Sequence, residues 1–375
     1  MKKTAIAVAS MLISTGVFAQ SSVTLYGLID EGFGFTNNAG GKKAYQTQSG
    51  WDAGDRWGLK GSEDLGGGLS AIFTLENGFS LDSGALGQGG RIFGRQAFVG
   101  MKSDSLGTVT FGRQYDTIVD YLGPLTANGG YGGWPFAHPY DNDNTDNTFR
   151  ANNAVKYSSP KFGGAQIEGL YGFSNQAGGF ATNRLYSTGV SYSGGGLSLA
   201  AAYLQANAGG ANASGALATN DTNFVAQRQQ TWGVAATYVL GSATAGLNYT
   251  HTSLLNPTSS AYIGSLGTTS SLKFDNVEVF GKYQFTPAFF GLVMYNFTEG
   301  NLDTSTGKSK PKWNQVGLLG DYYLSKRTDV YVQGTYQHVT GGEGTVFANA
   351  YITGSAAPSS NNSQLLLRIG MKHAF

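Results

Sequence analysis

The chain of 375 residues contains no cysteine and only 8 prolines. An exported chain without cysteine has neither a disulfide framework nor thiol chemistry. Beyond the first twenty residues, the sequence has no uninterrupted apolar run of the roughly 20 residues that a membrane-spanning helix needs. If the mature chain is a membrane protein, it therefore does not cross the bilayer as helices.

The N-terminus reads MKKTAIAVASMLISTGVFAQ and has the parts of a secretory signal peptide. Lys2 and Lys3 form a basic start, an apolar run extends from Ala5 to about Val17, and small residues lead up to Ala19. The apolar run is too short for a transmembrane helix. We expect cleavage after Ala19, so that residues 1–19 are the signal peptide and residues 20–375 form one exported domain.

Glycine and aromatic residues are abundant, with 57 Gly, 21 Tyr and 22 Phe. Many short strands with Gly-rich turns and aromatic side chains are the expected structure. The 24 basic residues balance 23 acidic ones, and removing Lys2 and Lys3 with the signal peptide leaves 22 basic residues. This balance indicates no nucleic-acid partner and no polybasic membrane contact.

Apolar and polar residues alternate most clearly in the C-terminal QLLLRIGMKHAF. Leu367 and Ile369 share one face of this predicted strand, and Arg368 and Lys372 share the other. This pattern fits a sheet between lipid and water, although an edge strand of a soluble sandwich has it too. Fifteen further segments read as strands, at residues 21–35, 55–61, 68–79, 95–102, 108–114, 153–160, 165–173, 185–192, 197–206, 230–240, 243–252, 273–285, 289–298, 313–324 and 328–339.

The connections between these segments alternate between short turns and long loops rich in Gly, Ser, Asn and Thr, as in outer-membrane barrels. A strand in hydrocarbon must pair both of its edges, so the sheet has to close. The sequence therefore predicts an all-β fold, a sixteen-stranded antiparallel transmembrane β-barrel wide enough for an aqueous channel. Aromatic residues near strand ends suit interfacial girdles, namely Tyr157, Tyr171, Phe173, Tyr238, Tyr283, Phe285, Phe289, Tyr322, Tyr323 and Phe375.

One stretch, Gly112 to Lys156, interrupts the alternation. From Tyr115 to about Phe149 it has no two-residue period, and Asp recurs at positions 116, 120, 141, 143 and 146. A loop of this length is uncommon unless it is functional or disordered. We interpret it as a loop that folds into the pore and narrows it.

Six motifs carry a family resemblance: SSVTLYGLID, RWGLKGSEDLGGGLSAIFTLENGF, GRQAFVGMKSDSLGTVTFGRQYD, RANNAVKYSSPKFGG, YYLSKRTDVYVQGTY and RIGMKHAF. In this order they resemble the general porins of Gram-negative outer membranes, and specifically the trimeric sixteen-stranded porins typical of β-proteobacteria. The resemblance covers essentially all of the mature chain. It implies a homotrimer in outer-membrane lipid, with one pore per monomer and an inward-folded third loop that forms a constriction.

In that family, arginines on the barrel wall face acidic groups on or near the third loop. Carried over by motif, the resemblance implies a pore constriction formed by Arg56, Glu76, Arg95, Arg113, Asp116, Asp120 and Arg150. The middle of the loop matches no pattern that can be placed residue by residue. It therefore stays open which of Asp141, Asp143 and Asp146 line the pore.

Strand parity tests four of these positions independently. Arg56 and Glu76 are out of phase with the apolar residues of their strands, so both face the lumen. Arg95 is a weaker case, because it is in phase with apolar neighbours. Arg113 falls on the lipid face, where a charge would cost about 2 to 4 kcal/mol at the midplane. We expect Gly112 to permit a bulge that turns Arg113 inward.

The predicted function is passive diffusion of ions and small hydrophilic solutes, with a mild anion preference because four arginines face three acids. An outer-membrane hydrolase is the main alternative. The four histidines include no metal-spaced pair, and there is no GxSxG motif, so we expect no enzyme activity, no metal and no cofactor. An adhesin or a purely structural barrel is the third possibility, and it would not conduct ions.

Two features of the long loop, His138 and the segment DNDNTD, are not interpreted as functional sites. His138 could titrate near the pore, but an unremarkable loop residue is the preferred interpretation. The segment DNDNTD lacks the Gly and the distal Glu of a calcium-binding loop. We expect it to be a solvated loop.

Overall fold

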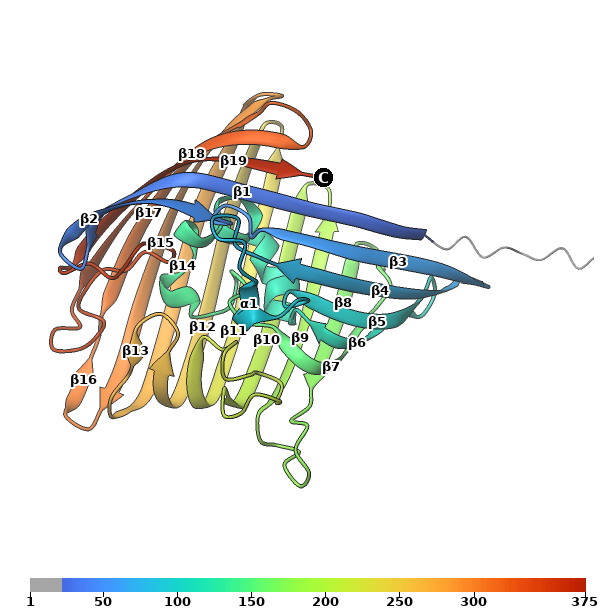
Figure 1. Cartoon of the computed structure of the whole chain (residues 1–375), viewed down its shortest axis with the longest axis horizontal. Coiled ribbons are helices and arrows are strands. Elements are labelled where there is room, and N and C mark those ends of the chain that lie inside the picture. The colour runs from blue at the N-terminus through green and yellow to red at the C-terminus, as the bar shows by residue number, and fades with distance from the viewer. Residues whose placement is uncertain (1–21) are drawn as a thin grey trace, which may run out of the picture.

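A computed structural model describes residues 22–375, and the predicted signal peptide, residues 1–19, lies outside the described residues. The chain forms a single antiparallel sheet. Its first strand, β1 (Ser22–Ala39), pairs with its last, β19 (Ser363–Ala374), from Leu28 opposite Ala374 to Thr36 opposite Leu366. This pairing closes the sheet into a barrel, in which the blue β1 lies beside the red β19 (Figure 1).

The 19 segments of the sheet make up sixteen barrel strands, as predicted. β2 (Lys42–Ser49) and β3 (Arg56–Gly66) pair with two successive parts of β1 and form one interrupted strand. β13 (Gly264–Ser265) and β16 (Gly307–Ser309) only extend hairpins. The others are β4 (Leu69–Gly78), β5 (Gln96–Ser103), β6 (Gly107–Gln114), β7 (Ala151–Ser158), β8 (Ala165–Gly172), β9 (Arg184–Gly194), β10 (Leu197–Gly209), β11 (Phe224–Leu240), β12 (Ala243–Ser260), β14 (Thr269–Thr286), β15 (Phe289–Thr304), β17 (Lys312–Tyr323) and β18 (Thr328–Thr340).

Several strands extend beyond their predicted limits. β12 continues to Ser260 and β14 starts at Thr269, so most of the stretch between the strands predicted at residues 243–252 and 273–285 is also strand. The strand predicted at residues 55–61 was too short, because β3 runs on to Gly66. Lys42–Ser49 was not predicted as a strand. The reason is common to all three: where a strand leaves the membrane, both of its faces are polar and the alternation that marks it disappears.

Apolar side chains face outward and polar ones inward over most of the barrel. Exposed residues include Val234, Leu247 and Ile369, whereas the buried inner positions include Asn276 and Gln315. Of the aromatic residues predicted for the girdles, Tyr171 is half-buried and the others are exposed. Within residues 22–375, no helix is both long and apolar enough to cross a membrane. This distribution of side chains fits a barrel surrounded by lipid.

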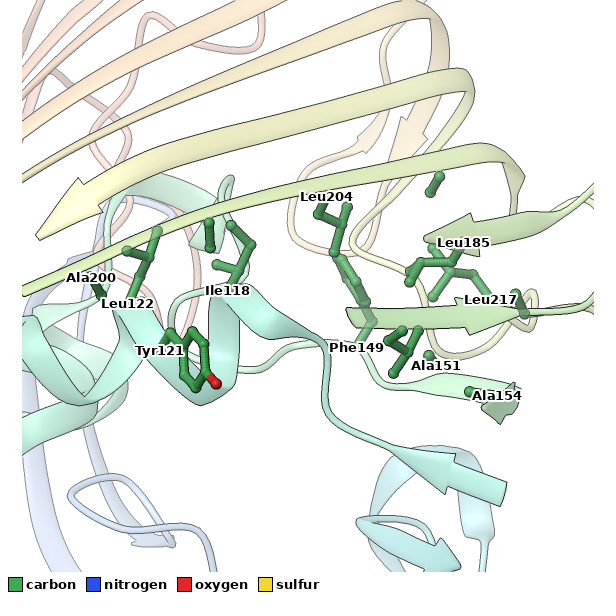
Figure 2. Packing of buried hydrophobic residues seen from close by; sticks show 14 of the residues in the cluster. Ile118, Tyr121, Leu122, Phe149, Ala151, Ala154, Leu185, Ala200, Leu204 and Leu217 are labelled. Carbon is green, nitrogen blue, oxygen red and sulfur yellow. The ribbon is translucent and has the colours of Figure 1, made fainter. Parts of the chain in front are cut away.

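The interrupting stretch between β6 and β7 forms five helical turns: η1 (Ile118–Leu122), η2 (Gly123–Leu125), η3 (Asn128–Gly132), η4 (Trp134–Phe136) and η5 (Pro139–Asp141). Ile118 and Leu122 of η1 pack in one cluster with Ala200 and Leu204 of β10 (Figure 2). On the other side, Gln315 of β17 donates to the Ala137 carbonyl at 3.1 Å. We call residues 115–150 the inner segment, because its contacts are with inward-facing side chains of the wall.

Candidate functional site

A polar cavity of about 820 Å³ lies next to the inner segment. Three of the predicted arginines line it, although they come from distant parts of the chain. Arg56 begins β3, Arg95 immediately precedes β5, and Arg150 immediately precedes β7. Each stands at or just before the first residue of a strand, and closure of the barrel brings the three positions together.

Arg95, which lines the cavity, forms an ion pair with Glu76. Arg95 Nε donates to Glu76 Oε1 at 2.8 Å, and the Tyr26 hydroxyl donates to Oε2 at 2.9 Å. Glu76 faces inward as its parity on β4 predicts. Arg95 is also inward despite its unfavourable parity, because β5 begins only at Gln96 and residue 95 lies outside the alternating strand.

The bulge expected at Gly112 is present. The register between β6 and β7 shifts between Gly112 and Gln114, and Gly112 has a φ of +135°. A Cβ at this position would lie 2.2 Å from the carbonyl oxygen of Ala97, so only glycine fits without movement. The bulge turns Arg113 into the interior, where its Nη1 donates to Asn152 Oδ1 at 2.6 Å.

Arg113 forms an ion pair with an aspartate that was not predicted from the sequence. Asp221 lies in the loop between β10 and β11, and its Oδ2 is 2.6 Å from Arg113 Nη1. The neighbouring Asn220 accepts from Arg91 Nη2 at 2.7 Å, and Asn223 donates to the Tyr140 carbonyl at 2.7 Å. This loop therefore reaches both the inner segment and the loop between β4 and β5. A lone Asp in a polar loop offers no periodic signal from which the contact could have been predicted.

Asp116 and Asp120 do not face the arginines, contrary to the prediction. Asp116 is fully buried, and its carboxylate accepts from the backbone N–H of Ile118 and the side-chain amide of Asn144, each at 2.8 Å. Burial and the nearby charge of Asp120 raise the pKa of Asp116 to about 7. Asp120 lies 2.5 Å from Lys156 Nζ. Asp116 lies just before η1, where the free N–H groups of Ile118 and Val119 donate to its carboxylate. Asp120, within η1, ties the segment to Lys156 of β7.

Of the three aspartates left open, only Asp146 lines the cavity. Asp141 accepts from the backbone N–H groups of Asp146 and Thr148, both at 3.0 Å. Asp143 Oδ2 is 2.6 Å from His138 Nδ1. The interpretation of DNDNTD as a solvated loop was wrong, because all six of its residues are buried. Local donors help to make this burial possible, since the carboxylates of Asp141 and Asp143 find hydrogen-bond partners.

His138 is not an ordinary loop residue either. It is fully buried, and its Nε2 lies 3.7 Å from Glu278 Oε2 on β14. Burial lowers the pKa of His138, but the carboxylates of Asp143 and Glu278 outweigh burial and raise the pKa to about 9. Burial would raise the pKa of Asp143, but the charge of His138 holds it below its ordinary value. Because the Thr250 hydroxyl of β12 also donates to Asp143 at 2.5 Å, this cluster fixes the inner segment to the wall.

Comparison with known proteins agrees with this architecture. The sequence model of the Gram-negative porin family matches residues 4–342. The chain belongs to the Gram-negative porins. An outer membrane porin protein of Bordetella pertussis is 31% identical to this porin, over 90% of this chain and 94% of its own length. Like its homologues, this porin is an outer-membrane protein, as the sequence predicted.

Two solved structures resemble this porin in fold. An anion-selective porin from Comamonas acidovorans has a TM-score of 0.71 at 24% identity, and the match covers 95% of this chain and 100% of that one. The trimer form of OmpT from Vibrio cholerae has a TM-score of 0.67 at 18% identity, over 95% of this chain and 99% of that one. At these identities the similarity shows the barrel fold alone.

In this porin the charges along the cavity are unevenly paired. Asp52 lies 2.6 Å from Lys372 Nζ, and Asp221 pairs with Arg113. Arg56 and Arg150, in contrast, form no ion pair with any carboxylate among residues 22–375. The Arg150 guanidinium instead lies 5.3 Å from the centre of the Tyr115 ring. In the same described range, no group of three or more His, Cys, Asp or Glu side chains is arranged to hold a metal ion.

Proposed function

We infer that this porin forms a water-filled channel through which ions and small hydrophilic solutes diffuse passively, with a mild preference for anions. The observation that carries this proposal is the polar cavity beside the inner segment, with Arg56 and Arg150 on its wall and without ion-pair partners among the described residues. Charged side chains around a narrow passage bias which ions enter it. Unpaired guanidinium groups there favour anions.

The inner segment is the element that narrows the channel in this proposal. Arg56, Arg95 and Arg150 line the passage, Glu76 contributes through its ion pair with Arg95, and Arg113 contributes through its contact with Asp221. Asp116 and Asp120 have no place in this set. The similar structure from Comamonas acidovorans is that of an anion-selective porin, which is in line with the charge balance at this cavity.

Assembly and processing follow the same proposal. We expect three copies to associate in the membrane, each with its own channel, and the signal peptide to be removed after Ala19. Mass spectrometry of the purified protein would then give a mature N-terminus at Gln20, and cross-linking in the membrane would stop at trimers. A mature chain that retains residues 1–19, or one that runs only as a monomer, would contradict these two points.

Passive diffusion is tested by the swelling of liposomes that contain the purified porin. Uncharged sugars of increasing size should enter at steadily decreasing rates, because the cavity sets a size limit without a binding step.

Selectivity is tested by Arg56→Glu, which reverses one charge at the passage and should shift the reversal potential in a KCl gradient towards cations. Lys308→Glu is the matched control, because Lys308 lies on an exposed hairpin. Absence of swelling, or equal shifts in the two variants, would refute the proposal.

A further inference from the structure

The barrel strand made of β2 and β3 is interrupted by residues 50–55, which we call the inward loop. β1 pairs with β2 as far as Glu31 opposite Ser49, and with β3 from Leu28 opposite Arg56. Only two residues of β1 lie between these pairs, whereas the inward loop has six, an excess of four. An ordinary β-bulge adds a single residue. All six residues of the loop line the polar cavity, so the excess folds into the lumen.

Charged and polar side chains of the wall hold the inward loop in place. The carboxylate of Asp30 on β1 accepts from the backbone N–H groups of Asp52 at 2.8 Å and of Ala53 at 3.2 Å. Lys372 Nζ on β19 lies 2.6 Å from Asp52 Oδ2, and the ring of Trp51 is buried. Hydrogen bonds to charged groups are stronger than those between neutral groups. The loop is therefore fixed to two neighbouring strands and does not move aside for a passing solute.

The inward loop and the inner segment meet inside the barrel. The backbone N–H of Trp134 donates to the carbonyl oxygen of Trp51 at 2.9 Å. Gly133 has a φ of +56°, and a Cβ there would lie 1.9 Å from the same carbonyl oxygen. Only glycine permits this approach. Since Trp134 also lines the cavity, the loop and the inner segment bound the passage together.

The inward loop also fixes the position of two arginines of the passage. Its last residue directly precedes Arg56, so the point at which the chain rejoins the sheet decides where Arg56 stands. A Cβ on Gly54 would lie 3.0 Å from Arg95 Nη1, so the backbone of the loop packs against that guanidinium. Three residues leading inward and three leading back reach at most roughly 10 Å from the wall. This reach is sufficient to narrow the passage beside the two arginines.

We propose that the inward loop is a second constriction element, which sets the size limit of the channel together with the inner segment. This inference rests on the proposed channel function and adds a size-determining element to it. The loop discriminates among hydrophilic solutes by their width, because its wall contacts prevent it from yielding. A narrow solute passes, and a wider solute of the same charge is held back.

Deletion of residues 51–54 tests this role, because Gly50 and Asp55 then stand opposite the two unpaired residues of β1. The strand becomes continuous, and the variant should have a larger single-channel conductance than the wild type. In liposome swelling, the entry of large uncharged sugars should increase more than the entry of small ones. The matched control is deletion of residues 304–307, which shortens the hairpin between β15 and β16 by the same number of residues and should change neither property.

A chemical modification tests the same role without shortening the chain. The porin has no cysteine of its own, so Ala53→Cys introduces a single thiol in the inward loop. A methanethiosulfonate reagent that carries a trimethylammonium group should label this thiol and reduce the current. Ser305→Cys, on the exposed hairpin between β15 and β16, is the control and should conduct equally before and after labelling.

The outcomes separate this inference from the channel proposal. A wild type that does not conduct would refute the channel itself. With a conducting wild type, an unchanged conductance and size limit after deletion of residues 51–54 would overturn the role of the inward loop. Failure of the reagent to reach the cysteine of Ala53→Cys, or an unchanged current after complete labelling shown by mass spectrometry, would overturn it as well. The labelling result stands even if the deletion variant does not fold.

Discussion

Neutralising Asp221 would show whether the loop between β10 and β11 sets part of the charge of the channel. Asp221 Oδ2 and Arg113 Nη1 are 2.6 Å apart, with side-chain exposures of 2% and 8%. At this separation the two charges largely cancel for an ion that passes through the cavity. Asp221→Asn removes one of them and leaves Arg113 uncompensated. The variant should still fold, because Arg113 keeps its hydrogen bonds to the Gly94 carbonyl and to Asn152.

The size of the effect follows from Coulomb's law. An ion about 8 Å from the freed charge, in a medium close to water, changes in energy by about 0.5 kcal/mol. The sign is opposite for anions and cations, so their energies diverge by roughly 1 kcal/mol. This divergence alone raises the anion-to-cation permeability ratio about fivefold, and screening at 0.1 M salt reduces the gain to about twofold.

The assay is the reversal potential of single channels in a KCl gradient at low and high salt. We expect Asp221→Asn to increase the anion preference, and more so at low salt. Asp303→Asn is the matched control, since Asp303 lies on an exposed hairpin beside Lys308. The double variant Arg113→Gln/Asp221→Asn should return close to the wild-type ratio. A cationward shift, or no difference between Asp221→Asn and its control, would refute the reasoning.

Three further substitutions test other parts of the structure. Gly112→Ala places a Cβ 2.2 Å from the Ala97 carbonyl oxygen at a φ of +135°, and should lower stability by about 1 to 3 kcal/mol, measured as a lower heat-denaturation temperature on gels. The pKa of His138 is raised from 6.5 to about 9 in the folded protein. The stabilisation that its positive charge gives to the inner segment is therefore complete below about pH 6.5 and is lost as the pH rises through about 9. Current noise in wild-type channels should therefore rise above pH 9, whereas His138→Gln should be noisy at every pH. Arg368→Gln leaves the fully buried Asp30 without its 3.1 Å ion-pair partner and should cost about 3 to 5 kcal/mol, measured by the same heat denaturation; an unchanged denaturation temperature would contradict this.

The strands were predictable because lipid imposes a rule on every second residue. At membrane depth an outward position has to be apolar, as at Leu367 and Ile369, and the sequence therefore shows a two-residue period. The ends of β12 and β14 were not predictable, since Ser260 and Thr269 lie in a stretch without an apolar two-residue period. Hydrogen bonding alone continues the ladder there.

The residues of the candidate site likewise include some whose positions were predictable from the sequence and some whose contacts were not. Glu76 follows from strand parity, and the inward turn of Arg113 follows from the cost of a charge in lipid together with the glycine before it. Parity does not apply within helical turns, so it could not test Asp116, which the family resemblance alone had placed opposite the arginines. The contacts of Asp221 and His138 were not predictable, because they join segments far apart in the chain through loops without periodicity.

We propose that an open aqueous passage exists beside the inner segment and that Arg56 and Arg150, which have no ion-pair partner among residues 22–375, set its ion preference. The most direct measurement is the single-channel current of the wild type and of Arg56→Gln/Arg150→Gln in planar bilayers under a KCl gradient. We expect the wild type to conduct with a mild anion preference, and the double variant to conduct with that preference lost or reversed. A wild-type protein that does not conduct, or an anion preference unchanged in the double variant, would contradict the claim.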